Sequence, residues 1–272
     1  MLGSGMANQV GASAGALAFP VIGPLGVVAI RQWVAATVLW ATARPKPRAF
    51  TAAQWRPVLT LALVYAVMNL TLYTAIDRVG LGLAVTLEFL GPLSVALFGT
   101  TPPGSRRRRD VICAVIAAGA VLVLIHPAPS TDYLGIGVGL LAAVCWACYI
   151  LLNRSIGRRL PGLEGSATAA TVSALAYVPV GVVWLTFHPP TLAALGGALA
   201  AGVLSSAVPL LADLLALRRV PAQFFGMFMS VQPVFAALAG LVILGQRLSW
   251  TSWLAIGVIV AVNTVAVRGQ RA

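Results

Sequence analysis

The chain has 272 residues, of which 60% are hydrophobic and only 9% are charged, and its formal net charge is +12. A soluble domain carries about 45–50% apolar and about 25% charged residues, so this composition excludes a protein whose surface faces water throughout and indicates lipid as the solvent. The basic residues fall in short gaps between apolar runs, which favours contact with the membrane surface over nucleic-acid binding.

A helix needs about 20 apolar residues to cross about 30 Å of hydrocarbon. A first run, 1–19, is short and rich in Gly, Ala and Ser, and we expect a truncated first helix there. Nine clear runs follow it: 24–42, 57–76, 79–98, 111–126, 134–152, 167–187, 197–217, 222–244 and 250–267. The sequence therefore predicts an all-α membrane protein with about ten transmembrane helices.

The distribution of Lys and Arg predicts the orientation of these spans. Alternate gaps, together with the C-terminal tail, hold 15 of the 18 basic residues, whereas the other gaps hold two, and Arg31 lies inside a span. Because basic side chains favour the cytoplasmic side, we expect a multi-pass protein of the inner (plasma) membrane with both termini in the cytoplasm. The run Arg106–Arg109 would then lie against anionic lipid.

An internal repeat is visible at an offset of 141 residues. The matched pairs are Ala75 with Ala216, Arg78 with Arg219, Val79 with Val220, Pro92 with Pro233, and Leu97 with Leu238. Five spans per half is an odd number, so the two halves must insert in opposite senses. The sequence predicts two inverted five-helix repeats, 1–127 and 133–268, an architecture of transporters with the substrate site near the bilayer midplane.

Three polar side chains are predicted to form one layer inside the membrane. At 1.5 Å per residue, Arg31 and Asn69 lie roughly 10 Å and Glu88 roughly 13 Å from the outer ends of their spans. Arg31 could bind a carboxylate, Glu88 could bind an amine or carry a proton, and Asn69 could orient a polar ligand. The alternative is that Arg31 and Glu88 form a permanent ion pair that only holds helices together.

Other residues in the spans are candidates for coupling and motion. Asp213, near the cytoplasmic end of its span, could couple transport to protons or ions, or form an interfacial ion pair with the arginines that follow it. Trp146 either lines the substrate cavity or packs. Gly91-Pro92 and Gln232-Pro233 occupy equivalent positions, and we expect each proline to break its helix towards a cavity or to make a static kink.

Nothing in the sequence points to catalysis. Histidine, cysteine and carboxylate residues show no metal-ligand spacing, and there is no Gly-rich phosphate loop. We therefore expect no enzyme activity, no cofactor and no metal. The expected partners are a small-molecule substrate and membrane lipid, without nucleic acid, and a homodimer is left open.

Several motifs resemble a known family. The segment Val79-Gly80-Leu81-Gly82-Leu83-Ala84-Val85-Thr86-Leu87-Glu88-Phe89-Leu90-Gly91-Pro92-Leu93 resembles the fourth-span signature of EamA-type drug/metabolite transporters, and it looks closest to the threonine/homoserine exporter branch. Further similar segments are 145–151, 205–209 with Asp213 after it, 219–221, and 229–233, where Gln232 stands in place of a more usual acidic residue. That exchange argues against a proton relay at position 232.

The resemblance implies ten spans in two inverted repeats, cytoplasmic termini, and efflux of small metabolites coupled to an ion gradient or to exchange. Our interpretation is a secondary transporter that exports threonine- or homoserine-like amino acids, or similar small metabolites, by alternating access. A drug or purine/nucleoside exporter is the alternative within the family. A membrane-embedded enzyme and a non-transporting scaffold or sensor are alternatives of other classes.

Overall fold

The computed structural model describes residues 2–79, 81–98, 108–125, 131–160, 163–219, 231, 234–235 and 249–268, and within these ranges the chain is helical and has no strand. The helices are α1 (Leu2–Ala16), α2 (Phe19–Ala43), α3 (Ala52–Val79), α4 (Leu81–Phe98), α5 (Arg108–Ile125), α6 (Tyr133–Arg159), α7 (Glu164–Phe187), α8 (Leu192–Gly202), α9 (Val208–Arg219) and α12 (Trp250–Arg268). A short 3-10 helix, η1 (Pro47–Ala49), precedes α3, and a π-helical segment, η2 (Val203–Ala207), joins α8 to α9.

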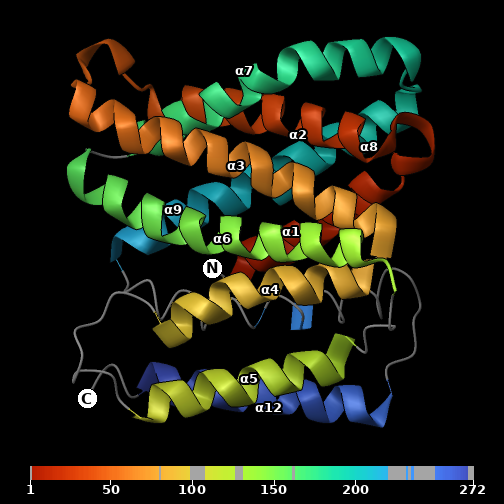
Figure 1. The fold of residues 1–272 in the computed structure, drawn as a ribbon, viewed down its shortest axis with the longest axis vertical. Helices are drawn as coiled ribbons and strands as arrows, with labels where there is room; N and C mark the ends of the chain where they lie inside the picture. The colour runs from red at the N-terminus through yellow and green to blue at the C-terminus, as the bar shows by residue number, and fades with distance from the viewer. Residues whose placement is uncertain are drawn as a thin grey trace.

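The helices lie side by side and run roughly perpendicular to the longest axis of the molecule (Figure 1). Helix α3 packs against α6 and α7, and α2 packs against α7 and α8. Helix α1 packs against α8, η2 and α9, while α5 and α12 pack together at the edge farthest from α7. Segments from the two ends of the chain are thus interleaved rather than separated into two bodies.

Five helices of the described residues are long and apolar enough to cross a membrane: Phe19–Ala43, Ala52–Val79, Tyr133–Arg159, Glu164–Phe187 and the merged helix Leu192–Asp213. Large apolar side chains in the middle of these helices point outward, since Leu63, Val144 and Val183 are 65%, 59% and 57% exposed. Exposing such an apolar surface to water would cost free energy, whereas exposing it to lipid does not. The chain is a multi-pass membrane protein.

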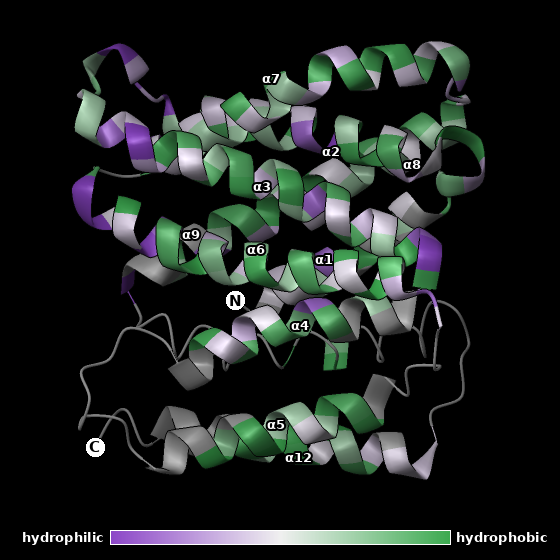
Figure 2. Ribbon diagram, viewed as in Figure 1, coloured by the Kyte–Doolittle hydropathy of each residue, from purple (hydrophilic) through white to green (hydrophobic). Residues whose placement is uncertain are grey.

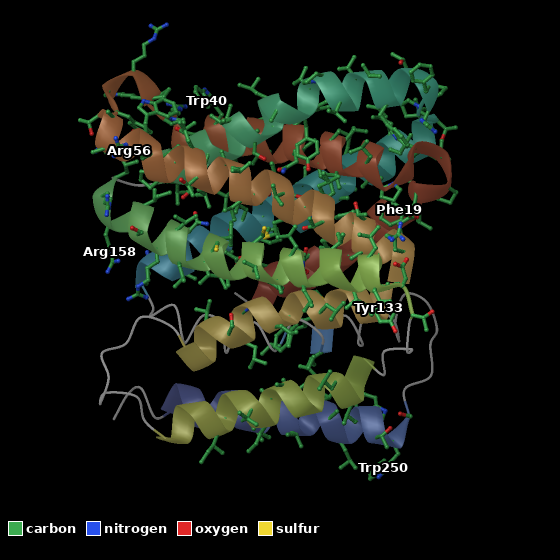
Figure 3. All side chains as sticks on the ribbon, in the orientation of Figure 1. Phe19, Trp40, Arg56, Tyr133, Arg158 and Trp250 are labelled. Carbon is green, nitrogen blue, oxygen red and sulfur yellow. The ribbon has the colours of Figure 1, made fainter. Side chains whose placement is uncertain are left out.

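The two ends of the helix bundle differ in charge. Arg56 and Arg158 lie at one end, and Phe19, Tyr133 and Trp250 lie at the other (Figure 3). Hydrophilic residues gather at helix ends, above all where α3 begins and α6 ends (Figure 2). Arg56 and Arg158, which come from two of the basic gaps, therefore share one end of the bundle.

Helix ends follow local signals. Arg44 ends α2 in the left-handed conformation (φ 44°, ψ 54°) with its N–H donating to the Trp40 carbonyl, and Pro45 follows. Asp132 caps α6 by accepting the Gly135 N–H at 2.9 Å, and Thr191 caps α8 by accepting the Ala194 N–H at 3.2 Å.

Eight of the nine clear runs predicted from sequence coincide with these helices, counting α8, η2 and α9 as one. The ninth, 222–244, lies almost wholly outside the described residues. The doubtful run 1–19 forms α1, whose 15 residues are fewer than the roughly 20 that a perpendicular span requires.

Two irregularities were not predicted. Helix α2 bends at Gly23, whose φ of 66° and ψ of 170° suit glycine, and Pro24 follows it. The second is the π-helical turn η2, in which the Val208 N–H bonds to the Val203 carbonyl. Such turns are rare and are often found at functional sites.

Candidate functional site

Arg31 lies midway along α2 and reaches the π-helical turn. Its Nε donates to Ser206 Oγ at 2.9 Å and its Nη2 donates to the Ser205 carbonyl at 3.1 Å. The guanidinium carbon lies 5.1 Å from the centroid of the Tyr73 ring, which adds a cation–π contact. The two hydrogen bonds use two of five N–H donors, so the guanidinium keeps donors for a carboxylate.

The sequence around η2 explains why Arg31 binds there. Pro209 has no N–H to give to the carbonyl of Ser205, four residues earlier, and its ring disturbs the regular helix at that point. A carbonyl without a donor is costly away from water. The Arg31 guanidinium supplies that donor from a neighbouring helix.

Glu88 is buried in the helix bundle, on α4, and only 8% of it is exposed. It makes no hydrogen bond or ion pair with any other described residue. Its charge interacts with that of Arg31, but no ion pair joins these two described side chains. The permanent Arg31–Glu88 pair, which the sequence left as an alternative, does not form.

Asn69 lies on α3 in a polar stripe spaced by four residues, with Tyr65 before it and Tyr73 after it. Its Nδ2 donates to the Tyr65 carbonyl at 2.9 Å, and its side chain is half-buried. The Arg31 guanidinium lies over the ring of Tyr73. The stripe therefore leads from the guanidinium along α3 towards the basic end of the bundle.

The remaining candidates lie around this centre. Asp213 is half-buried on α9 and acts electrostatically on Tyr65 and Tyr149, and it makes no ion pair with the described side chain of Arg219. Trp146 is half-buried on α6 and packs against the main apolar core. A ligand-contacting role for Asp213 and Trp146 stays a prediction.

Gly91 and Pro92 are both buried, and α4 stays helical through them from Leu81 to Phe98. A Cβ on Gly91 would collide with the Ala143 carbonyl oxygen and lie 3.2 Å from the Ala147 nitrogen, so glycine lets α4 and α6 approach backbone to backbone. The helix break at this position stays a prediction. Its counterpart, Gln232-Pro233, lies outside the described residues.

Sequence reasoning missed the groups that hold Arg31 and the buried tyrosines beside it. Ser205, Ser206 and Tyr73 contact the guanidinium, and Tyr65 and Tyr149 stack with their ring centroids 6.1 Å apart. Pro209 in the middle of an apolar run, preceded by two serines, was the available signal for an interrupted helix. In the described part of the chain, no group of three His, Cys, Asp or Glu could hold a metal ion.

Comparison with known proteins places the chain in a family. The model of the EamA-like transporter family matches residues 133–267. The threonine/homoserine exporter RhtA of Escherichia coli (strain K12) is 36% identical over 271 residues, which cover 96% of this chain and 89% of that protein. The chain belongs to the EamA-like transporter family. It lies near the RhtA branch, because RhtA of Salmonella typhimurium (strain SL1344) is also 36% identical, over 94% of this chain and 85% of that protein.

The fold of this EamA-like chain is also that of a solved crystal structure. The TM-score is 0.79 at 20% sequence identity, and the match covers 97% of this chain and 96% of the other. An identity this low supports the arrangement of the helices and nothing about the substrate.

Proposed function

We propose that this EamA-like chain is a secondary transporter that exports amino acids of the threonine/homoserine class across the inner membrane by alternating access. Two lines support the substrate class. Relatives of which the chain covers 85% to 89% are named threonine/homoserine exporters. Two described side chains of opposite charge inside the helix bundle, the buried Glu88 and Arg31, also form no ion pair with each other.

The observation that carries the proposal is that Glu88 is buried and that no other described residue forms an ion pair or hydrogen bond with it. A buried carboxylate needs a compensating charge or a proton, which a ligand or protonation can supply. An amino acid carries an ammonium and a carboxylate on one carbon. Glu88 binds the ammonium, the spare donors of Arg31 bind the carboxylate, and Asn69 orients the substrate beside them.

Coupling follows from the same carboxylate. Glu88 can neutralise its buried charge either with the substrate ammonium or with a proton, and the two exclude each other. Substrate release on one side then requires protonation from that side. Asp213, half-buried and nearer the basic end of the bundle, is the second proton-carrying group in this scheme.

The architecture that we propose has ten spans in two inverted five-helix repeats, 1–127 and 133–268. Helix α3 spans 52–79 and the α8–η2–α9 segment spans 192–219, so both bounds shift by 140 residues. Gln32 donates to Ser173 Oγ at 3.1 Å across an offset of 141 residues. Equivalent residues that touch each other are expected on the axis relating two repeats. The basic end of the bundle, and both termini, then face the cytoplasm.

Replacement of Glu88 by glutamine tests the proposal. In proteoliposomes loaded with unlabelled threonine, we expect the wild type to accumulate labelled threonine by counterflow. Glu88→Gln should lose at least 100-fold of that rate, because the amide neither balances the ammonium nor carries the proton. Insertion and detergent melting temperature should remain close to those of the wild type, since Glu88 has no described partner to lose.

Glu164→Gln is the matched control. Glu164 lies in the first turn of α7, where its carboxylate accepts the Lys46 N–H at 3.4 Å, away from Arg31 and Glu88. This variant should retain transport within about twofold. Wild-type counterflow by Glu88→Gln, or equal loss in both variants, would refute the role of Glu88; no counterflow of threonine or homoserine by the wild type would refute the substrate class.

A further inference from the structure

A small cavity lies between α3, α6 and α7, on the side of the site nearer the basic end of the bundle. Its volume is about 10 Å³, and its polar lining consists of Tyr65, Tyr149, Asn153 and Ser166, with small and aliphatic side chains around them. This volume accommodates one water molecule or one hydroxyl group. The cavity is therefore a site for a single polar atom rather than a whole metabolite.

The cavity walls present hydrogen-bonding groups that the described residues do not satisfy. Tyr65 is 8% and Tyr149 is 4% exposed, and neither phenolic hydroxyl bonds to any described residue. Asn153 accepts from Ser166 Oγ at 2.8 Å and donates to the Tyr149 carbonyl at 3.0 Å, which leaves one amide N–H. Two buried tyrosines, and an asparagine with one amide N–H that no described residue accepts, thus line a space of hydroxyl size.

Tyr177 shows how a buried tyrosine is satisfied elsewhere in the same protein. Its hydroxyl donates to the Ala66 carbonyl at 2.8 Å, on the neighbouring helix α3. Leaving a buried hydroxyl without a partner costs free energy comparable to a lost hydrogen bond. Among the described residues, the hydroxyls of the two stacked cavity tyrosines have no such partner, which points to a ligand atom beside them.

The cavity lies further along α3 from the site proposed for the ammonium and carboxylate groups of the amino acid. Tyr73 lies under the Arg31 guanidinium, Asn69 follows one turn along α3, and Tyr65 follows one turn further. Tyr73 and Tyr65 are two helical turns apart, about 11 Å along α3, which is longer than a threonine or homoserine molecule. The Tyr65 hydroxyl nevertheless interacts electrostatically with the Arg31 guanidinium, so a substrate held by Arg31 and Glu88 can direct its side-chain hydroxyl towards that of Tyr65.

We propose that the cavity formed by Tyr65, Tyr149, Asn153 and Ser166 is the subsite that binds the side-chain hydroxyl of the transported amino acid. This inference rests on the proposed function and specifies its substrate class as short hydroxy amino acids. The tyrosine hydroxyls and the Asn153 amide select such substrates, because an analogue without a hydroxyl leaves buried polar groups unpaired.

The test compares threonine with 2-aminobutyrate, which has the same chain length and lacks the hydroxyl. The counterflow rates of both are measured for wild type, Tyr65→Phe and Tyr149→Phe, with homoserine as a second hydroxylated substrate. We expect the wild type to prefer threonine, and each variant to lower the threonine to 2-aminobutyrate ratio at least tenfold through slower threonine transport. Tyr177→Phe is the matched control and should leave the ratio within twofold of the wild type.

The outcomes separate this inference from the proposed function. A wild type that moves none of the three amino acids refutes the proposed function and the subsite with it. A wild type that transports threonine, together with variants that keep its ratio or lose both substrates equally, refutes the subsite alone and indicates a structural water in the cavity. If either tyrosine variant fails to fold, Ser166→Ala decides, with at least a threefold lower ratio expected and an unchanged ratio contradicting the subsite.

Discussion

Helix α3 and the segment α8–η2–α9 begin 140 residues apart, at 52 and 192, and end 140 residues apart, at 79 and 219, yet only α3 is a regular helix. The later segment contains a π-helical turn followed by Pro209, and Arg31 from α2 donates to the Ser205 carbonyl there. In α3 the Tyr177 hydroxyl also donates to a backbone carbonyl, that of Ala66, but no proline interrupts the turn that follows it. In the α8–η2–α9 segment, the Arg31 side chain from α2 donates to a carbonyl that Pro209 cannot serve. A ligand that contacts Arg31 can therefore affect the conformation of this segment.

Among the variants that test this difference between the two segments, replacement of Arg31 should have the largest effect on stability and transport. Arg31→Met keeps the unbranched apolar stem of the side chain but removes two hydrogen bonds and the cation–π contact with Tyr73. Hydrogen bonds of a charged donor contribute about 1.5–3 kcal/mol each, so we expect a lower melting temperature together with a loss of threonine counterflow of at least 100-fold. The melting temperature is measured on purified protein in detergent, and threonine counterflow is measured in proteoliposomes.

Arg56→Met provides the control for charge and side-chain length. Arg56 is exposed at the start of α3, and no hydrogen bond or ion pair joins its side chain to another described residue. Its replacement should leave counterflow within about twofold. If Arg31→Met transports as Arg56→Met does, Arg31 neither completes the π-helical turn nor binds substrate.

Pro209→Ala should have an intermediate effect, because it makes the second segment more like α3. The new N–H can bond to the Ser205 carbonyl, and an internal proline costs a helix about 3 kcal/mol. We expect a melting temperature equal to or above that of the wild type and a counterflow rate about tenfold lower, since Arg31 loses one acceptor and the turn becomes rigid.

Pro57→Ala near the start of α3 controls for proline removal as such, and it should change transport by less than twofold. A Pro209→Ala variant that melts earlier and transports normally would contradict this prediction. The π-helical turn would then contribute to stability alone.

The sequence predicts the helices well and the contacts between them poorly, for a physical reason. Length and hydropathy decide whether a run can cross a membrane, so the runs that became α2, α3, α6 and α7 were recognisable without partners. Polar residues in those runs were also recognisable, because charges are rare in lipid. Glu88 and Arg31 stood out on that ground alone.

The partners of these residues depend on tertiary placement. Depth along a helix suggested an Arg31–Glu88 pair, but depth carries no information on which face each side chain occupies. Ser205 and Ser206, 174 and 175 residues away in sequence, bind Arg31 instead. Tyr65 and Tyr149 look like ordinary packing residues until the fold places both beside one cavity.

The smallest predicted effect concerns the ends of the two segments. Arg78, at the end of α3, forms an ion pair with Asp132 at 3.0 Å, whereas its counterpart Arg219 is exposed and, among the described residues, forms no ion pair. The Gly135 N–H and the Arg78 guanidinium hold the pKa of the Asp132 carboxyl below its usual range. A lowered folded-state pKa means that this stabilisation is present above the unfolded-state pKa, about 3.9, and is lost as pH falls through the folded value.

Asp132→Asn isolates the ion pair, because asparagine still caps α6 through the Gly135 N–H. For an exposed pair, we expect the variant to melt only about 2 °C below the wild type at pH 7. The difference should disappear below the folded-state pKa and shrink in 1 M salt, where the screening length is about 3 Å. Arg219→Gln should show no such difference at any pH. A gap between wild type and Asp132→Asn that persists in 1 M salt would assign the effect to the cap of α6, and Arg78 would then be no more constrained than Arg219.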